Sequence, residues 1–336
     1  NNTFSNITGG TSAITIMNLN YGGTGGGNGN VVQGNVISNI TGEGAITGIT
    51  HSSSTTGGVV SFFGNTITGL SSTGTGGSVT ALASSSATSH VYSNVIGDLS
   101  STGSASTVTG ISISSATASN IYKNKVYGLT SNGASGIANG ITVSAGTTSN
   151  IYNNIVGNLS APTASLANAI NGINITGGTT VNAYYNTVYF SASSSGANFG
   201  TTALFANTTP TVTLRNNLLH NASSANGTGL AVAYRRSGTT LTSYGSASNN
   251  NDFVAATIYY DGTTPYSWSG YQALVATRDA ASVNWTPVYL SLVGNSANFL
   301  HIDPAVATLL ESGAVNITTP AITDDYDANI RQGNGG

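Results

Sequence analysis

The segment Asn94–Ser100 reads NVIGDLS, and close copies of it recur along the chain. Related segments begin at Asn35 (NVISNIT), Asn65 (NTITGLS), Asn124 (NKVYGLT) and Asn154 (NIVGNLS), so that successive copies are 30, 29, 30 and 30 residues apart. The copies share an asparagine, an aliphatic residue two positions later, Ile or Leu five positions later, and then Ser or Thr. A fixed period of this length is typical of proteins whose repeats stack on one another.

Weaker copies extend the period in both directions, at Asn2 (NTFSNIT), Asn186 (NTVYF) and Asn217 (NLLHN). Each period also holds two further short runs, such as VTGISI from Val108 and NIYKN from Asn120. The runs are β-branched, alternate between polar and apolar residues, and are separated by Gly, Ser, Thr and Asn, which indicates strands joined by turns. Three short strands in about 30 residues predict one coil of a right-handed parallel β-helix, an all-β solenoid whose coils lie about 4.8 Å apart.

The clarity of the period divides the chain. We expect regular coils over residues 1–240, irregular last coils with insertions over 241–320, and a closing segment or flexible tail over 321–336.

The asparagines that open each repeat define a column. The aliphatic residues that follow them should point inward and form the core, since they recur at one place in every coil. An asparagine at a turn can bond to its own backbone and to the asparagine of the next coil, so we expect a structural ladder. Its members are Asn35, Asn65, Asn94, Asn124, Asn154, Asn186 and Asn217.

An aromatic column lies two residues before the ladder. If the residue before each aromatic points inward, the aromatics point outward and form a stripe on one face. Such a stripe either stabilises the coils by pairing between neighbouring strands or offers a platform for sugar rings and partner surfaces. Its members are Phe63, Tyr92, Tyr122, Tyr152 and Tyr184, with Arg215 at its end.

Charge is scarce in this chain. It has 7 Lys+Arg and 10 Asp+Glu, which is 5% of 336 residues, and a net charge of −3. Nucleic-acid binding needs a basic surface, so this composition argues against a nucleic-acid partner. No run of 18 apolar residues is present, which argues against insertion into a membrane as a helix. The absence of cysteine excludes disulfides and thiolate zinc sites.

The regular coils hold few residues that could perform catalysis. Up to Asn217 the acids are Glu43 and Asp98, and they fall in different coils, whereas glycoside hydrolysis needs two carboxylates close together. The four histidines are scattered and are expected at the surface or in turns: His51, His90, His220 and His301. The sequence therefore predicts a protein that is not an enzyme, with no catalytic residues and no cofactor.

One acidic cluster is a candidate cation site, formed by Asp324, Asp325 and Asp327. A calcium loop needs oxygen ligands at alternate positions followed by a bidentate acid, and this acid is missing. We therefore expect no metal, with calcium at this cluster as the alternative. Arg235 and Arg236 are expected to pair with acids of the last coils. The run GGTGGGNGN from Gly22 lacks the lysine and the helix of a phosphate loop, so it is predicted to be a long turn.

Three segments carry a family resemblance: SNNNDFV from Ser248, WSGYQALVATRDAASV from Trp268 and ITDDYDANIR from Ile322. They resemble the last coils and closing segment of right-handed parallel β-helix (pectate-lyase-like) surface proteins common in Bacteroidota. Ala328 stands where the closing pattern usually has glycine. The resemblance implies a large secreted protein, exported through the type IX system, of which this chain is a fragment.

These observations predict a non-catalytic, secreted solenoid that serves as an adhesin stalk or structural segment, located outside the cell or on its surface. Its expected partners are other domains of the same chain, glycans or a component of type IX secretion. The alternative is a polysaccharide-binding or degrading module that uses the aromatic stripe. A third hypothesis is ice binding by a threonine face with Thr47, Thr80, Thr109 and Thr142.

Overall fold

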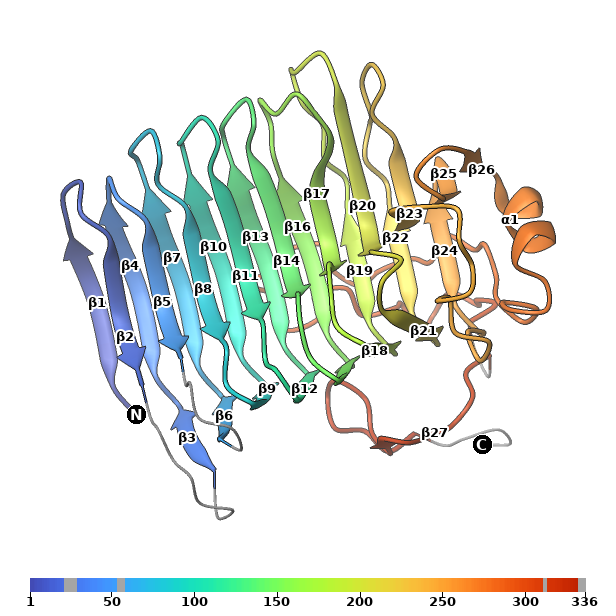
Figure 1. Cartoon of the computed structure of the whole chain (residues 1–336), viewed down its shortest axis with the longest axis horizontal. Helices are drawn as coiled ribbons and strands as arrows, with labels where there is room; N and C mark the ends of the chain where they lie inside the picture. The colour runs from blue at the N-terminus through green and yellow to red at the C-terminus, as the bar shows by residue number, and fades with distance from the viewer. Residues whose placement is uncertain (21–28, 53–57, 311–312, 332–336) are drawn as a thin grey trace.

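The computed structural model describes residues 1–20, 29–52, 58–310 and 313–331. Over these ranges the chain winds into a parallel β-solenoid of about eight turns, with three sheets and about 30 residues per coil (Figure 1). The predicted fold class, an all-β parallel β-helix with three strands per coil, is confirmed.

The regular coils contribute one strand to each of three sheets, which we name A, B and C. Sheet A contains β1 (Thr3–Thr8), β4 (Val36–Gly42), β7 (Thr66–Ser72), β10 (Val95–Ser101), β13 (Lys125–Ser131), β16 (Ile155–Ser160), β19 (Thr187–Phe190), β22 (Leu218–Asn221) and β24 (Asp252–Ala255). Sheet B contains β2 (Ile14–Leu19), β5 (Ile46–His51), β8 (Val79–Ser84), β11 (Thr107–Ile113), β14 (Ile137–Val143), β17 (Leu166–Ile175), β20 (Phe199–Ala206), β23 (Ala231–Arg236), β25 (Thr257–Tyr260) and β26 (Pro265–Tyr266). Sheet C contains β3 (Asn30–Gln33), β6 (Val59–Phe63), β9 (Thr88–Tyr92), β12 (Ala118–Tyr122), β15 (Thr148–Tyr152), β18 (Thr180–Tyr184) and β21 (Thr211–Arg215).

The strand register follows the sequence period. Ile96 of β10 lies between Ile67 and Val126 of the neighbouring coils, and Leu99 pairs with Leu129. All five side chains are fully buried. The predicted inward columns are therefore confirmed as the core between the three sheets.

A sharp corner joins sheet C to sheet A in every coil. The residue directly before the ladder asparagine has a φ between +52° and +62°. This left-handed conformation costs an ordinary L-residue about 1–2 kcal/mol, yet glycine occupies only two of the eight corners. The occupants are Gly34, Gly64, Ser93, Lys123, Asn153, Tyr185, Asn216 and Asn250. The corner thus needs other interactions to hold it, and the ladder described below supplies them.

The last coils are closed by a helix, α1 (Trp268–Val275), whose Tyr271 and Val275 are buried in the main core. Ser267 caps its first turn by accepting a hydrogen bond from the Gly270 amide. No helix among the described residues is long and apolar enough to cross a membrane.

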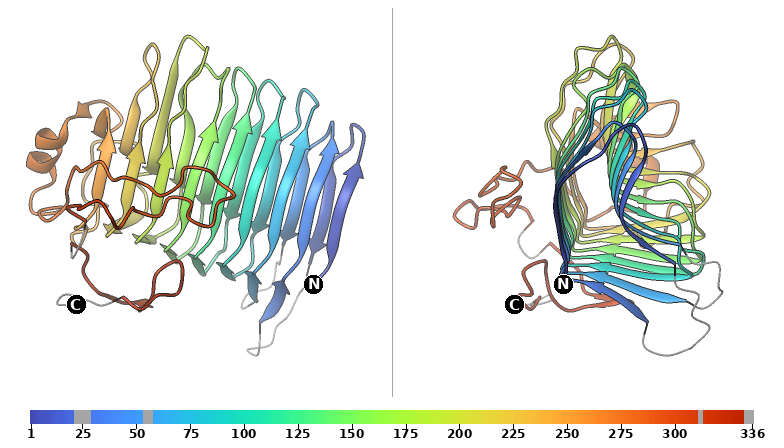
Figure 2. Two further views of the ribbon diagram at one scale, coloured as in Figure 1. Left: turned by 180° about the vertical axis from the view of Figure 1, so that it is seen from behind. Right: turned by 90° about the vertical axis from the view of Figure 1, so that its left-hand side faces the viewer.

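Residues 285–310 and 313–331, which we call the arm, turn back along the outside of sheet A (Figure 2). Phe299 and Leu300 of the arm pack on Tyr127 and Ile155, which are outward residues of β13 and β16. Farther along, β27 (Ile317–Thr318) and β28 (Ala321–Ile322) form a small hairpin. The arm therefore covers part of the solenoid's outer surface, and this determines which columns stay open.

Candidate functional site

The asparagine ladder lies at the corner between sheets C and A. The Asn65 side-chain amide donates to Asn94 Oδ1 at 2.9 Å and to the Val32 carbonyl at 2.9 Å. Asn94 Oδ1 also accepts from the Asn65 backbone N–H at 3.0 Å. The same pattern repeats from coil to coil, and the seven predicted members are at most 3% exposed. Because each amide is bonded within the protein, the ladder stabilises the corner and offers nothing to a ligand.

The ladder is longer than the sequence analysis assigned. Asn2 adds a rung at one end, with its side chain 3.2 Å from Asn35 Oδ1, and Asn251 adds one at the other. Asn251 belongs to the SNNNDFV segment and follows Asn217 by 34 residues. The adjacent asparagines hid which of the three continues the column.

Asp279 ends the ladder. Its carboxylate accepts hydrogen bonds from Asn251 Nδ2 at 2.9 Å, Ser282 Oγ at 2.6 Å, and the hydroxyls of Tyr244 and Tyr271 at 2.5 Å each. Burial, and next the Asp279 charge, raise the pKa of both tyrosines well above the usual value. A carboxylate accepts but does not donate, so no further asparagine can follow in the same direction.

The aromatic stripe forms a regular stack on the outer face of sheet C. Ring centroids of Phe63, Tyr92, Tyr122 and Tyr152 are 4.8, 4.8 and 4.7 Å apart, and neighbouring planes differ by 8° or less. All four residues are half-buried. Because neighbouring rings cover each other's faces, the stack presents ring edges and hydroxyls to solvent. A platform on which sugar rings stack needs an open ring face, which these neighbours block.

Tyr184 does not continue the exposed stripe, contrary to the sequence analysis. It is only 7% exposed and packs against Ile317 and Ile322 of the arm, with Tyr152 at the edge of this cluster. The sequence column is correct in register, since Tyr152 pairs with Tyr184. The aperiodic arm, which the repeat does not predict, covers its last member.

A second polar ladder runs beside the stack, and sequence analysis missed it. Asn120 Nδ2 lies 3.1 Å from His90 Nδ1, Asn150 donates to Asn120 at 2.9 Å, and Asn182 donates to Asn150 at 2.9 Å. We call these four residues the outer ladder. They are half-buried, and burial lowers the pKa of His90. The signal was present in the repeated NIY triplets, where the asparagine two positions before each tyrosine shares its face.

The three acids of the candidate cation site face different partners. Asp324 forms an ion pair with Lys123 at 2.6 Å, and Asp327 bonds to His301 Nε2 at 2.6 Å. Asp325 accepts the backbone N–H groups of Asp327 and Asn329 at 2.9 Å each. Within the described part of the chain, no three His, Cys, Asp or Glu side chains group as metal ligands. Ala328 has a φ of +67°, a conformation that glycine adopts without the strain it causes in alanine.

Among the residues that the structure describes, neither Arg235 nor Arg236 forms an ion pair with an acid, contrary to expectation. Arg236 is fully buried and donates to Tyr234 Oη at 3.0 Å and to Ser243 Oγ at 2.6 Å. Arg235 donates to Thr202 Oγ1 at 2.8 Å and lies 4.7 Å from the ring centre of Tyr260. Neutral oxygens and aromatic rings therefore solvate these two cations.

Two histidines expected at the surface are buried. His51 is 3% exposed, with Nδ1 2.5 Å from Ser86 Oγ. His220 is 7% exposed and contacts Tyr189 and Tyr289. His51 lies in the column of Leu19 and Ser84, so the strand alternation turns its ring away from solvent. His220 lies on the outer face of sheet A, where the arm covers it.

The threonine face is interrupted. Thr47, Thr80 and Thr109 share one column, but Asn139 takes the next place in it. Thr142 belongs to a different column, where it pairs with Ser112. The expected fourth member is therefore wrong, and the glycine-rich run from Gly22 lies largely outside the described residues.

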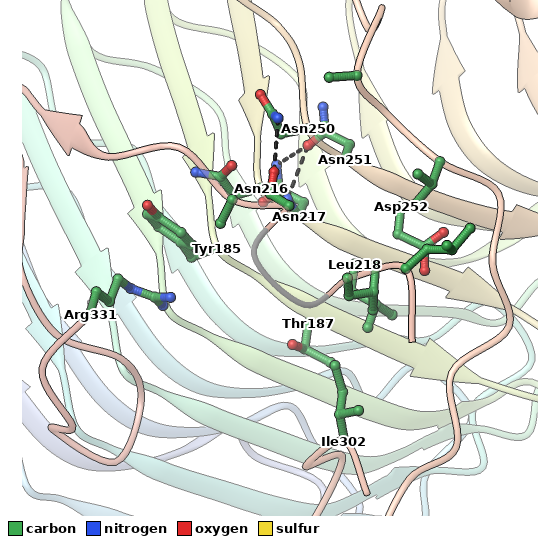
Figure 3. A pocket seen from close by; sticks show the side chains of 16 residues that line it. Tyr185, Thr187, Asn216, Asn217, Leu218, Asn250, Asn251, Asp252, Ile302 and Arg331 are labelled. Atoms are coloured by element: carbon green, nitrogen blue, oxygen red, sulfur yellow. Dashed lines mark hydrogen bonds between the residues drawn. The ribbon is translucent and has the colours of Figure 1, made fainter. Parts of the chain in front are cut away.

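A cavity of about 230 Å³ lies between the arm and the corner of sheet A (Figure 3). Asn216, Asn250 and Asp252 line it from the solenoid, and Ile302 and Arg331 line it from the arm. The amides of Asn216 and Asn250 bond to the arm carbonyls of Val315 and Gly313. The cavity thus belongs to the contact that holds the arm in place.

No family model, no curated protein and no solved structure matched this chain when each was compared with it.

Proposed function

We propose that this chain is a non-catalytic solenoid segment of an extracellular or cell-surface protein, where it serves as an adhesin stalk or structural spacer. The observation that carries the proposal is the asparagine ladder at the corner, which we call the inner ladder. It links coils from Asn2 to Asp279 without interruption. Every coil adds the same buried hydrogen bonds, so the segment is a rod with few loops open to proteases.

The placement of ionisable groups supports a role without catalysis. Asp324 and Asp327 are tied to Lys123 and His301, and Asp279 accepts four hydrogen bonds. Export through the type IX system, and partners in neighbouring domains of the same chain, belong to the same proposal. They are supported by the resemblance of the last 90 residues or so to Bacteroidota surface proteins.

The first test is the mass and location of the native polypeptide. We expect a mass far above 33.5 kDa and binding of a specific antibody to the polypeptide on intact cells. A native polypeptide of about 33.5 kDa that the antibody reaches only after the cells are lysed would contradict the proposal.

A second candidate function, polysaccharide binding, is favoured by the open part of sheet C. There the rows of tyrosines and outer asparagines repeat with each coil, at 4.7 to 4.8 Å between ring centres. A glycan lying along the axis would meet hydrogen-bonding edges, not ring faces. Retention on insoluble polysaccharide should fall at least tenfold in the double variant Tyr122→Phe/Asn120→Ala. The matched control Ser112→Ala on sheet B should bind like the parent; equal retention by both variants would contradict this candidate function.

A further inference from the structure

The root of the arm closes over an unusual carboxyl group. Asp252 of β24 is 1% exposed, and its Oδ1 accepts the Trp285 backbone N–H at 2.9 Å, at the first residue of the arm. Its Oδ2 is buried with no hydrogen-bond partner among the described residues. Neither ion pair found in that part of the chain involves Asp252.

A buried imidazole lies nearby on the adjacent strand. His220 of β22 is two residues beyond Leu218, which pairs with Asp252, so both side chains belong to the same patch of sheet A. His220 Nδ1 lies 3.3 Å from the hydroxyl of Tyr289, an arm residue, and the Asp252 charge contributes to raising the pKa of that tyrosine. Tyr289 of the arm therefore lies close to both groups.

The other ionisable groups around the pair do not neutralise a charge there. Tyr189 of β19 packs on His220 and Tyr289 through its ring. Arg331 and Tyr185 line the cavity on the side opposite Asp252 (Figure 3). The Arg331 guanidinium stacks on Tyr185 at 3.6 Å and donates to Asn153 and to the Asp324 carbonyl. A buried charge without a partner is costly, and such groups become neutral instead.

We infer that Asp252 and His220 form an uncharged acid–imidazole pair that latches the arm, and that opening the arm lets both ionise with opposite charges. When the arm closes, the His220 imidazolium loses one proton and the Asp252 carboxylate gains one. The net exchange of protons with the solvent is therefore zero. Between about pH 4 and 6.5 the closure of the arm is therefore insensitive to pH, although the contribution of each group alone is sensitive.

Burial determines the direction in which pH changes the contribution of each group to closure of the arm. Burial raises the pKa of Asp252 from 3.8 to about 7, so its contribution to closure is complete below 3.8 and is lost as pH rises through 7. Burial lowers the pKa of His220 from 6.5 to about 4, so its contribution is complete above 6.5 and is lost as pH falls through 4. From about pH 4 to 6.5 the two opposite effects, each up to about tenfold per pH unit, cancel.

The test is hydrogen exchange of residues 284–303 in the full chain, corrected for the intrinsic pH dependence of exchange. The parent should show less than a tenfold change in the opening constant from pH 4 to 6.5. In His220→Gln, opening should increase by up to about tenfold per pH unit as pH rises. In Asp252→Asn it should increase by a similar factor as pH falls, and the double variant should be flat.

Asp98→Asn is the matched control, since this acid is exposed on the same sheet, and it should behave like the parent. Single variants that keep the flat profile of the parent would overturn the inference. Infrared difference spectra between the parent and Asp252→Asn at pH 5.5 give a second measurement that needs no opening. They should show the band of a protonated carboxyl in the parent, and a carboxylate band there would also overturn the inference.

Discussion

The inner and outer ladders are both built mainly from asparagine side chains, but the two ladders differ in what these side chains can do. Asn124 and Asn120 lie four residues apart in one coil, and both bond to equivalent side chains in neighbouring coils. Asn124 is fully buried, with both N–H groups donated, whereas Asn120 is half-buried and keeps one N–H group and one lone pair for solvent. The comparison shows that an asparagine column is structural at the corner and available for binding on the open face. Water or a ligand can reach the half-buried amide of Asn120, whereas neither can reach the buried amide of Asn124.

The sharpest way to break the comparison is Asn124→Ala. Removal of the side chain leaves the Asn94 backbone N–H and one Asn94 side-chain N–H buried without an acceptor, at a cost of about 1–3 kcal/mol per group. It also takes one donor away from the Val91 carbonyl. We expect a loss of about 3 kcal/mol or more, measured as a shift of the denaturant midpoint. A loss below about 1 kcal/mol would mean that water reaches the corner.

The next effect in size is expected at the end of the ladder. Asp279→Asn replaces a charged group that accepts four hydrogen bonds by a neutral amide. The new NH2 group is a donor and faces groups that are themselves donors, so some of the four bonds are lost. Hydrogen bonds to charged groups contribute about 1.5–3 kcal/mol, so we expect a loss of about 2 kcal/mol. Hydrogen exchange should locate the loss in α1 and β24; a uniform loss along the solenoid would contradict an end-specific role.

The outer ladder supplies the counterpart, Asn120→Ala. Its neighbours His90 and Asn150 can bond to water, so the free energy of unfolding should fall by less than about 1 kcal/mol. The same denaturation experiment as for Asn124→Ala checks this. Equal losses in the two variants would remove the distinction between the ladders.

The smallest effect is expected at the corner itself, in Ser93→Gly. Ser93 is exposed and has a φ of +52°, a conformation that glycine adopts without strain and that Gly64 adopts one coil earlier. Release of the strain exceeds the added entropy of the unfolded chain, so we expect a gain of about 0.5 kcal/mol. A loss of stability would show that the serine side chain contributes to the corner.

Much of the fold could be predicted because its information is local and repeated. The spacing of Asn94, Ile96 and Leu99 assigns the corner and two inward columns, and the pairing partners follow from the period. The burial of Arg236 and His220 could not be predicted in this way. Arg236 depends on the hydroxyls of Tyr234 on its own strand and of Ser243 in a non-repeating loop, and His220 depends on the arm.

The sequence alone determined the coil length, the register and the side of the wall on which the repeated aliphatic, asparagine and aromatic columns lie, because strand alternation and a fixed period specify these quantities. Only the tertiary structure decided which outward residues stay open. Lys123 meets Asp324 across 201 residues, and this contact brings the arm over Tyr184 while Tyr92 and Tyr122 remain half-buried. Exposure of an outer column depends on contacts with a segment that has no period, and the spacing of residues within a repeat carries no information about such contacts.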